Sequence, residues 1–181
     1  DQRPGDWVWL TAVALFLLTP LAMIVWRGLP GIIALPPSVW AAAVRSLWVA
    51  GGATILGIAM ALTLALRGGA IIAVVGVMPL AASALVMGTG LFLMLLPLIN
   101  PTTAALPVTL LVNAVMALPF ALRIIAPAVV EVRRSYGPLA ETLGLRGWAL
   151  LRIVMLPRLR RPLGFAAGLT AALAIGDLGV I

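Results

Sequence analysis

The chain has 181 residues, of which 64% are hydrophobic and only 9% are charged, and its mean hydropathy is +1.21. Soluble domains carry about 25% charged residues, so this chain cannot cover a water-facing surface with polar groups and is expected to lie mostly in lipid. It contains no cysteine and no histidine. That composition excludes disulfides, the usual zinc sites and Ser–His or Cys–His nucleophile pairs, and we predict no cofactor.

Five apolar segments follow one another along the chain and predict an all-α bundle of transmembrane helices. No charged residue occurs between Arg67 and Arg123, a stretch long enough for two spans of about 20 residues each. The segments are apolar on all sides, as helices in lipid are, whereas strands of a membrane barrel would alternate. Because the chain begins at Asp1 and stops at Ile181 inside an apolar run, we expect a piece of a longer protein. The predicted spans cover residues 7–26, 47–66, 70–96, 107–129 and 162–181.

Prolines and glycines interrupt some of these spans. Pro79 breaks the third, and Pro119 lies in the fourth. Membrane helices tolerate such prolines, which can mark a bend beside a transport pathway or simply a static kink. Gly164 and Gly168 form a G-x-x-x-G motif in the fifth span, which would allow a close helix contact.

Eight of the twelve basic residues gather around the segment between the fourth and fifth spans. The positive-inside rule places such a segment in the cytoplasm. Arginines beside apolar spans favour a membrane-surface role over nucleic-acid binding, so we predict no nucleic-acid partner. The eight are Arg123, Arg133, Arg134, Arg146, Arg152, Arg158, Arg160 and Arg161.

Residues 130–161 are too many for a simple connection and have a helical pattern of their own. Pro138 fits the first position of a short helix over 139–143, and Gly144 suits the left-handed position that ends a helix. From the residues alone, two interpretations stay open. The segment is either a bent knob that fits a groove on a partner or an amphipathic hairpin on anionic lipid.

A second short helix is predicted over 147–155. Trp148, Leu151 and Met155 would share one of its faces, since they are spaced by three and four residues. Pro157 is expected to stop this helix, because the residue before a proline is pushed out of the helical region.

The same segment resembles the EAA loop of permeases from binding-protein-dependent ABC importers. The family motif reads E-A-A, three residues, Gly, and later V/I-x-L-P. The opening departs from it, since Pro138 and Leu139 stand where Glu and the first Ala are usual. The resemblance implies contact with an ATPase through this loop, with the coupling residues Ala140, Glu141, Gly144, Gly147, Trp148, Val154, Leu156 and Pro157.

The resemblance extends over nearly the whole chain. Segments 113–122, 161–163 and 175–180 are similar to the second half of thiamine importer permeases, which fuse two six-span halves in one chain. This implies a MetI-like ABC importer permease fold, with residues 1–181 forming a truncated second-half transmembrane permease domain. The implied function is translocation of thiamine or its phosphates across the bacterial inner membrane. Ferric-iron importer permeases share the layout and are the alternative.

The same resemblance implies the partners of the chain. They are a cytoplasmic ABC ATPase dimer, a periplasmic substrate-binding protein, the other permease half and the lipid bilayer. No G-x-x-x-x-G-K-[ST] loop occurs in the sequence, so ATP hydrolysis would belong to the separate ATPase subunit.

Three residues are candidates for the transport pathway or its gate: Asp177, Asn113 and Pro119. Asp177 is the only charged residue inside the fifth span and would lie about 22 Å along that helix from Pro162. A carboxylate within a span costs about 2.5–3.5 kcal/mol, so it is expected to face a cavity or a partner. It either lines the pathway or, equally, meets solvent or a further span near the interface.

Two rival functions are weighed against transport. An intramembrane serine protease needs a His or Lys partner, and an aspartyl type needs two intramembrane acids, so we predict that the chain is not an enzyme. A structural or channel subunit without ATP coupling is the other rival. The EAA-like loop separates it from a permease, because only a permease needs the loop to contact an ATPase.

Overall fold

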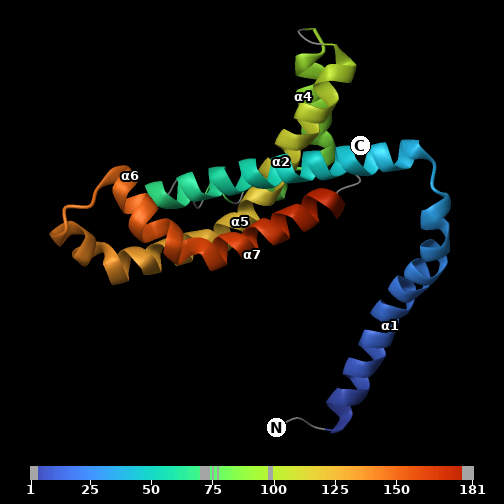
Figure 1. Ribbon diagram of the computed structural model, residues 1–181, viewed down its shortest axis with the longest axis horizontal. Coiled ribbons are helices and arrows are strands. Elements are labelled where there is room, and N and C mark those ends of the chain that lie inside the picture. Colours follow the sequence, from blue (N-terminus) through green and yellow to red (C-terminus); the bar gives the residue numbers. More distant parts are fainter. Residues whose placement is uncertain (1–3, 70–73, 75, 77, 98–99, 177–181) are drawn as a thin grey trace. The chain divides into compact units, whose positions relative to one another are not determined.

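The computed structural model describes residues 4–69, 74, 76, 78–97 and 100–176. Within these ranges all regular structure is helical (Figure 1), which confirms the predicted all-α class. Among the described residues, three stretches are long and apolar enough to cross a membrane: Trp7–Ile32, Pro37–Arg67 and Ala105–Thr142. The chain divides into two compact units, Asp1–Val44 and Arg45–Ile181.

The first unit consists of α1 (Pro4–Gly28), the 3-10 helix η1 (Leu29–Ala34) and the first residues of α2 (Pro37–Arg67). The span predicted over residues 7–26 lies within α1. The apolar side chains of α1 are exposed along the whole helix, and Trp7 and Trp26 near its ends are 60% and 79% exposed. A helix that is apolar all round and not covered by protein is suited to lipid.

The second unit contains the rest of α2 and two groups of elements after it. The 3-10 helix η2 (Met78–Ala81) and α4 (Ala84–Leu95) lie in the region of the third predicted span. The expected break at Pro79 is present, because Pro79 lies inside η2. The remaining elements are α5 (Pro101–Thr142), α6 (Gly147–Leu150), the π-helix η3 (Leu151–Met155) and α7 (Leu156–Gly176).

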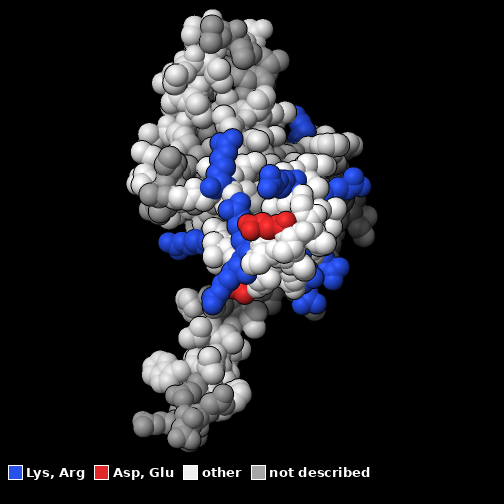
Figure 2. All heavy atoms as spheres, turned by 90° about the vertical axis from the view of Figure 1, so that its left-hand side faces the viewer, with Lys and Arg blue, Asp and Glu red and all other residues white. Residues whose placement is uncertain are grey.

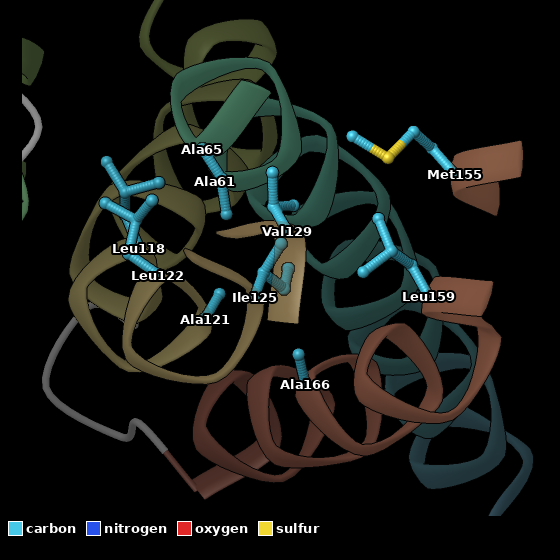
Figure 3. Close-up of a cluster of buried hydrophobic side chains, with 10 residues drawn as sticks. All are labelled: Ala61, Ala65, Leu118, Ala121, Leu122, Ile125, Val129, Met155, Leu159 and Ala166. Atoms are coloured by element: carbon cyan, nitrogen blue, oxygen red, sulfur yellow. The ribbon is translucent and has the colours of Figure 1, made fainter. Parts of the chain in front are cut away.

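The core of the second unit lies between α2, α5 and α7. In Figure 3, Ile125 and Val129 of α5 lie between Ala61 and Ala65 of α2 and Leu159 at the start of α7. Lipid tails are as apolar as these side chains, so close packing rather than the hydrophobic effect must stabilise the arrangement. The buried cluster comprises Ala61, Ala65, Leu118, Ala121, Leu122, Ile125, Val129, Met155, Leu159 and Ala166.

Small residues repeat every four positions along α2 and bring it close to its neighbours. The stripe is Ala53, Gly57, Ala61 and Ala65, all buried. A Cβ at Gly57 would lie 3.3 Å from the carbonyl oxygen of Ala114 in α5 and 3.5 Å from Cγ2 of Thr170 in α7. The three helices therefore meet at Gly57, where only a hydrogen fits comfortably.

The G-x-x-x-G motif singled out in α7 does not make a contact of this kind within the described chain. A Cβ built at Gly164 or at Gly168 would meet nothing within 4 Å. The stripe on α2 has alanine at three of its four positions, so the G-x-x-x-G pattern does not detect it, although this stripe makes the close helix contact.

Candidate functional site

The candidate coupling loop is a helical hairpin that bends sharply at Gly144. Gly144 has φ +68°, which confirms the predicted left-handed position at the end of a helix. The Leu145 N–H donates to the Ala140 carbonyl at 2.9 Å, and the Gly144 N–H donates to the Glu141 carbonyl at 3.0 Å. These two bonds form a Schellman motif, which satisfies carbonyls that the end of α5 would otherwise leave unpaired.

Two helix boundaries expected from proline are wrong. Pro138 does not begin a helix, because α5 continues without a break from Pro101 to Thr142. Pro157 does not stop one, because α7 begins at Leu156 and continues through it to Gly176. Most of segment 130–161 is therefore helical, and the two arms of the hairpin are direct extensions of α5 and α7.

The π-helix η3 explains how the chain passes through Pro157. The Leu156 N–H donates to the Leu151 carbonyl, five residues earlier, instead of four. Proline has no N–H, and its ring clashes with the carbonyl four residues before it in a regular α-helix. One wider turn directly before Pro157 relieves that clash, and π-turns of this kind are frequent at functional sites.

A second residue with positive φ follows the bend. Gly147 has φ +56°, and Arg146 before it is extended, with φ −134° and ψ 158°. Two glycines thus define the turn, one closing α5 and one opening α6. Gly147 was predicted to belong to the coupling loop but not to have a special backbone conformation, although a glycine directly before a helical run is a recognisable signal.

The predicted coupling residues divide into a buried base and an exposed tip. Ala140 is only 3% exposed and anchors the end of α5. Trp148 is 69% exposed, so the predicted shared face with Leu151 and Met155 is not formed: Met155 is buried, Leu151 is partly buried and Trp148 points outward. The π-turn shifts the 3.6-residue period on which that prediction relied. Glu141, Gly144, Gly147 and Pro157 are exposed, and Val154 and Leu156 are half-buried.

Arginines surround the hairpin. Figure 2 shows this end of the molecule with many arginine side chains and few acids. All eight arginines singled out between residues 123 and 161 are exposed, as are the two acids of that segment, Glu131 and Glu141. Such a surface attracts acidic groups of a protein or of a lipid headgroup.

Two of these arginines also tie the helices together. Arg133 of α5 donates a hydrogen bond to the Leu66 carbonyl at the end of α2. Arg158 in the first turn of α7 bonds the Tyr136 hydroxyl of α5 and lies over its ring. The hairpin is therefore fixed to the bundle at its base. Neither contact was predicted, since sequence spacing does not reveal pairs 67 and 22 residues apart.

Asn113, a candidate pathway residue, lies between α5 and α7. It is 4% exposed and lines a pocket of about 320 Å³. Pro119, also a candidate, is buried one to two turns further along α5 and does not line that pocket. Asp177 lies outside the described residues, so the structure does not bring it together with either of them.

The chain is 32% identical over 195 residues to the thiamine transport system permease protein ThiP of Salmonella typhimurium and 31% identical to that of Escherichia coli. Each match covers 99% of this chain and 36% of the relative. The chain matches the second half of thiamine transport permeases.

A thiamine transport permease of Brucella abortus is 38% identical over 97 residues, which are 54% of this chain and 18% of that protein. The chain spans about a third of the length of the first two permeases. No protein-family model and no solved structure matches it. The likeness to thiamine transport permeases confirms the resemblance identified from the loop motif and the flanking segments.

Proposed function

We propose that this chain is the second permease half of an ATP-driven ABC importer that moves thiamine or its phosphates across the bacterial inner membrane. The observation that carries the proposal is the match of 99% of the chain to permeases named for thiamine transport. In this proposal residues 1–181 form one truncated transmembrane domain. Its partners are the other permease half, a periplasmic substrate-binding protein, the lipid bilayer and a cytoplasmic ABC ATPase dimer.

The hairpin 130–161 is proposed to face the cytoplasm and to bind the ATPase. Its tip presents Leu143 and Trp148, 65% and 69% exposed, on either side of the Gly144 bend. Apolar and aromatic side chains at the centre of an arginine-rich surface are suited to filling a groove on a protein with acidic rims. A flat lipid surface would not require a sharp bend between the two arms, so the bend at Gly144 supports a protein partner with a groove.

The two arms of the hairpin explain how a movement of the ATPase would reach the membrane. Ala140 and Met155 are buried at the base of the arms, and α5 and α7 continue from the arms without a break. A force on the tip is therefore transmitted along two continuous helices rather than absorbed by a flexible loop. This relay needs no ATP-binding residue in the chain itself.

The test is reconstitution of the full-length permease into proteoliposomes with its ATPase and its binding protein. We expect uptake of labelled thiamine that requires ATP and stops when the ATPase is omitted. The matched control replaces the ATPase with a variant unable to hydrolyse ATP. If thiamine enters at the same rate without hydrolysis, the protein is a channel or carrier and the proposal is wrong.

A further inference from the structure

A pocket between α5 and α7 is lined by a side chain that has one polar atom without a hydrogen-bond partner among the described residues. It has a volume of about 320 Å³, and its wall consists of Asn113, Met116, Ala117, Phe120, Ala172, Leu173, Ala174 and Gly176. Pockets for small organic ligands start at about 300 Å³ and are mostly apolar with a few polar groups. Among the described residues of this wall, Asn113 has the one polar side chain.

Only one of the two polar groups of the Asn113 side-chain amide has a hydrogen-bond partner among the described residues. Its Nδ2 donates to the Ala174 carbonyl at 3.4 Å, a long bond, and only the amide nitrogen can donate there. Its Oδ1 is buried and has no hydrogen-bond partner among the described residues. A buried acceptor without a partner costs about 1–3 kcal/mol, so its presence in an apolar helix contact calls for an explanation.

We infer that this pocket is a substrate subsite in which Asn113 Oδ1 accepts a hydrogen bond from an N–H group of a cationic or neutral nitrogen heteroaromatic ligand. The inference rests on the proposed transport function and adds a recognition role to the permease itself. For thiamine, the donor is the exocyclic amine of the pyrimidine ring. No bond is made or broken in this step, which is binding alone.

The chemistry of the wall selects this ligand class. Asn113 Oδ1 is an acceptor and requires a donor, and none of the described residues that line the pocket has a cationic side chain to hold an anion. Phe120 is half-buried in the wall and Met116 is beside it. An aromatic ring and a thioether favour flat aromatic bodies, and a ring face also attracts positive charge.

Access to Asn113 Oδ1 depends on the position of the two helices. The atom is covered in this conformation, and we expect a ligand to reach it when α5 and α7 move apart. The same two helices form the arms of the hairpin. Occupancy of the subsite is therefore tied to the movement that the ATPase is proposed to drive.

The test compares thiamine with the analogue in which hydrogen replaces the exocyclic amine, so that the pyrimidine ring carries no N–H donor. The full-length permease, its ATPase and its binding protein are reconstituted, and the binding protein is saturated with one compound or the other. Because the binding protein is saturated in both cases, its different affinities for the two compounds do not affect the ratio of the two uptake rates. The permease variants are Asn113→Leu, which removes the acceptor, and Asn113→Asp, which keeps it.

Thr170→Val is the matched control. The Thr170 hydroxyl is also buried without a partner among the described residues, but Thr170 does not line the pocket. Co-purification of the ATPase and its basal hydrolysis show that each variant is assembled. We expect Asn113→Leu to lower the ratio of thiamine uptake to analogue uptake about five- to tenfold, as the loss of one hydrogen bond predicts. Asn113→Asp and Thr170→Val should keep the wild-type ratio within about twofold.

The outcomes separate the two proposals. If wild-type protein imports thiamine and Asn113→Leu assembles with an unchanged ratio, the subsite is wrong while the transport function stands. In that case Asn113 pairs with another part of the polypeptide instead. If Thr170→Val lowers the ratio as much as Asn113→Leu, the effect is structural and the subsite is also wrong. If wild-type protein imports neither compound, both proposals are wrong.

Discussion

Arg158 of α7 lies over the ring of Tyr136 of α5, with its Cζ 3.9 Å from the ring centre. Its Nη1 also donates to the Tyr136 hydroxyl. The two residues are on opposite arms of the hairpin, so this contact holds the arms together at the base. The bend at Gly144 is thereby connected to the membrane helices as one rigid element.

Loss of the Tyr136 ring should loosen this base. A cation over an aromatic ring at a partly exposed site contributes about 0.5–1 kcal/mol. We expect Tyr136→Leu to lower the free energy of unfolding of the full-length permease by about 1 kcal/mol. Tyr136→Phe keeps the ring and should lose about half as much. Thermal unfolding in detergent measures both, and equal losses in the two variants would contradict a role for the ring.

A side chain at Gly144 should disturb the bend. Non-glycine residues at φ near +68° cost roughly 1–2 kcal/mol, so Gly144→Leu is expected to distort the Schellman motif. ATP hydrolysis should continue, while hydrolysis-driven uptake falls about tenfold or more.

Gly137→Ala is the matched control for that change. Gly137 lies inside α5, and a Cβ there would meet nothing within 4 Å. Alanine is a better helix former than glycine, so the control should be neutral or stabilising by up to about 1 kcal/mol. Full coupled uptake by Gly144→Leu, or a loss in Gly137→Ala as large as in Gly144→Leu, would be inconsistent with the role assigned to the bend.

The close approach of three helices at Gly57 predicts a position-specific effect on α2. Gly57→Leu would push against the Ala114 backbone and Thr170 and should destabilise the bundle by about 1–3 kcal/mol. Gly51→Leu is on the same helix, where a Cβ meets nothing within 4 Å, and should be nearly neutral. Thermal unfolding of the two variants compares them directly, and similar melting temperatures would show that α2 does not pack as described.

The bond from Arg133 to the Leu66 carbonyl predicts a difference between two adjacent arginines. We expect Arg133→Gln to release the end of α2 and cost about 1 kcal/mol. Arg134 is also exposed, and its side chain has no hydrogen bond or ion pair among the described residues, so Arg134→Gln should have little effect. Hydrogen exchange at the end of α2 reports the release, and equal exchange in both variants would rule it out.

Features that depend on one residue or on composition could be predicted from the sequence. The apolar segments indicate helices in lipid, since composition alone decides that property. The left-handed backbone conformation of Gly144 was predicted correctly because this way of ending a helix depends on the residue type at a single position. The resemblance of the chain to thiamine importer permeases is confirmed by the match over 99% of its length, while the roles of the residues in the loop motif stay predictions.

Features that depend on packing could not be predicted. Pro138 and Pro157 follow local rules that favour helix boundaries, but the arms of the hairpin are held by buried contacts at Ala140 and Met155. The π-turn over Leu151–Met155 accommodates the hydrogen bond that Pro157 cannot donate. The candidate pathway also stays partly a prediction, since Asp177 lies outside the described residues and only Asn113 is placed in a pocket.

The proposed transport mechanism requires the tip of the hairpin to bind the ATPase. A photo-crosslinking amino acid at Leu143, which is 65% exposed, should crosslink the full-length permease to its ATPase. The matched control is the same amino acid at Phe165 on α7, which is 68% exposed and should crosslink to lipid or to the other permease half. Crosslinks from Leu143 to lipid alone, in a complex that still contains the ATPase, would contradict the account.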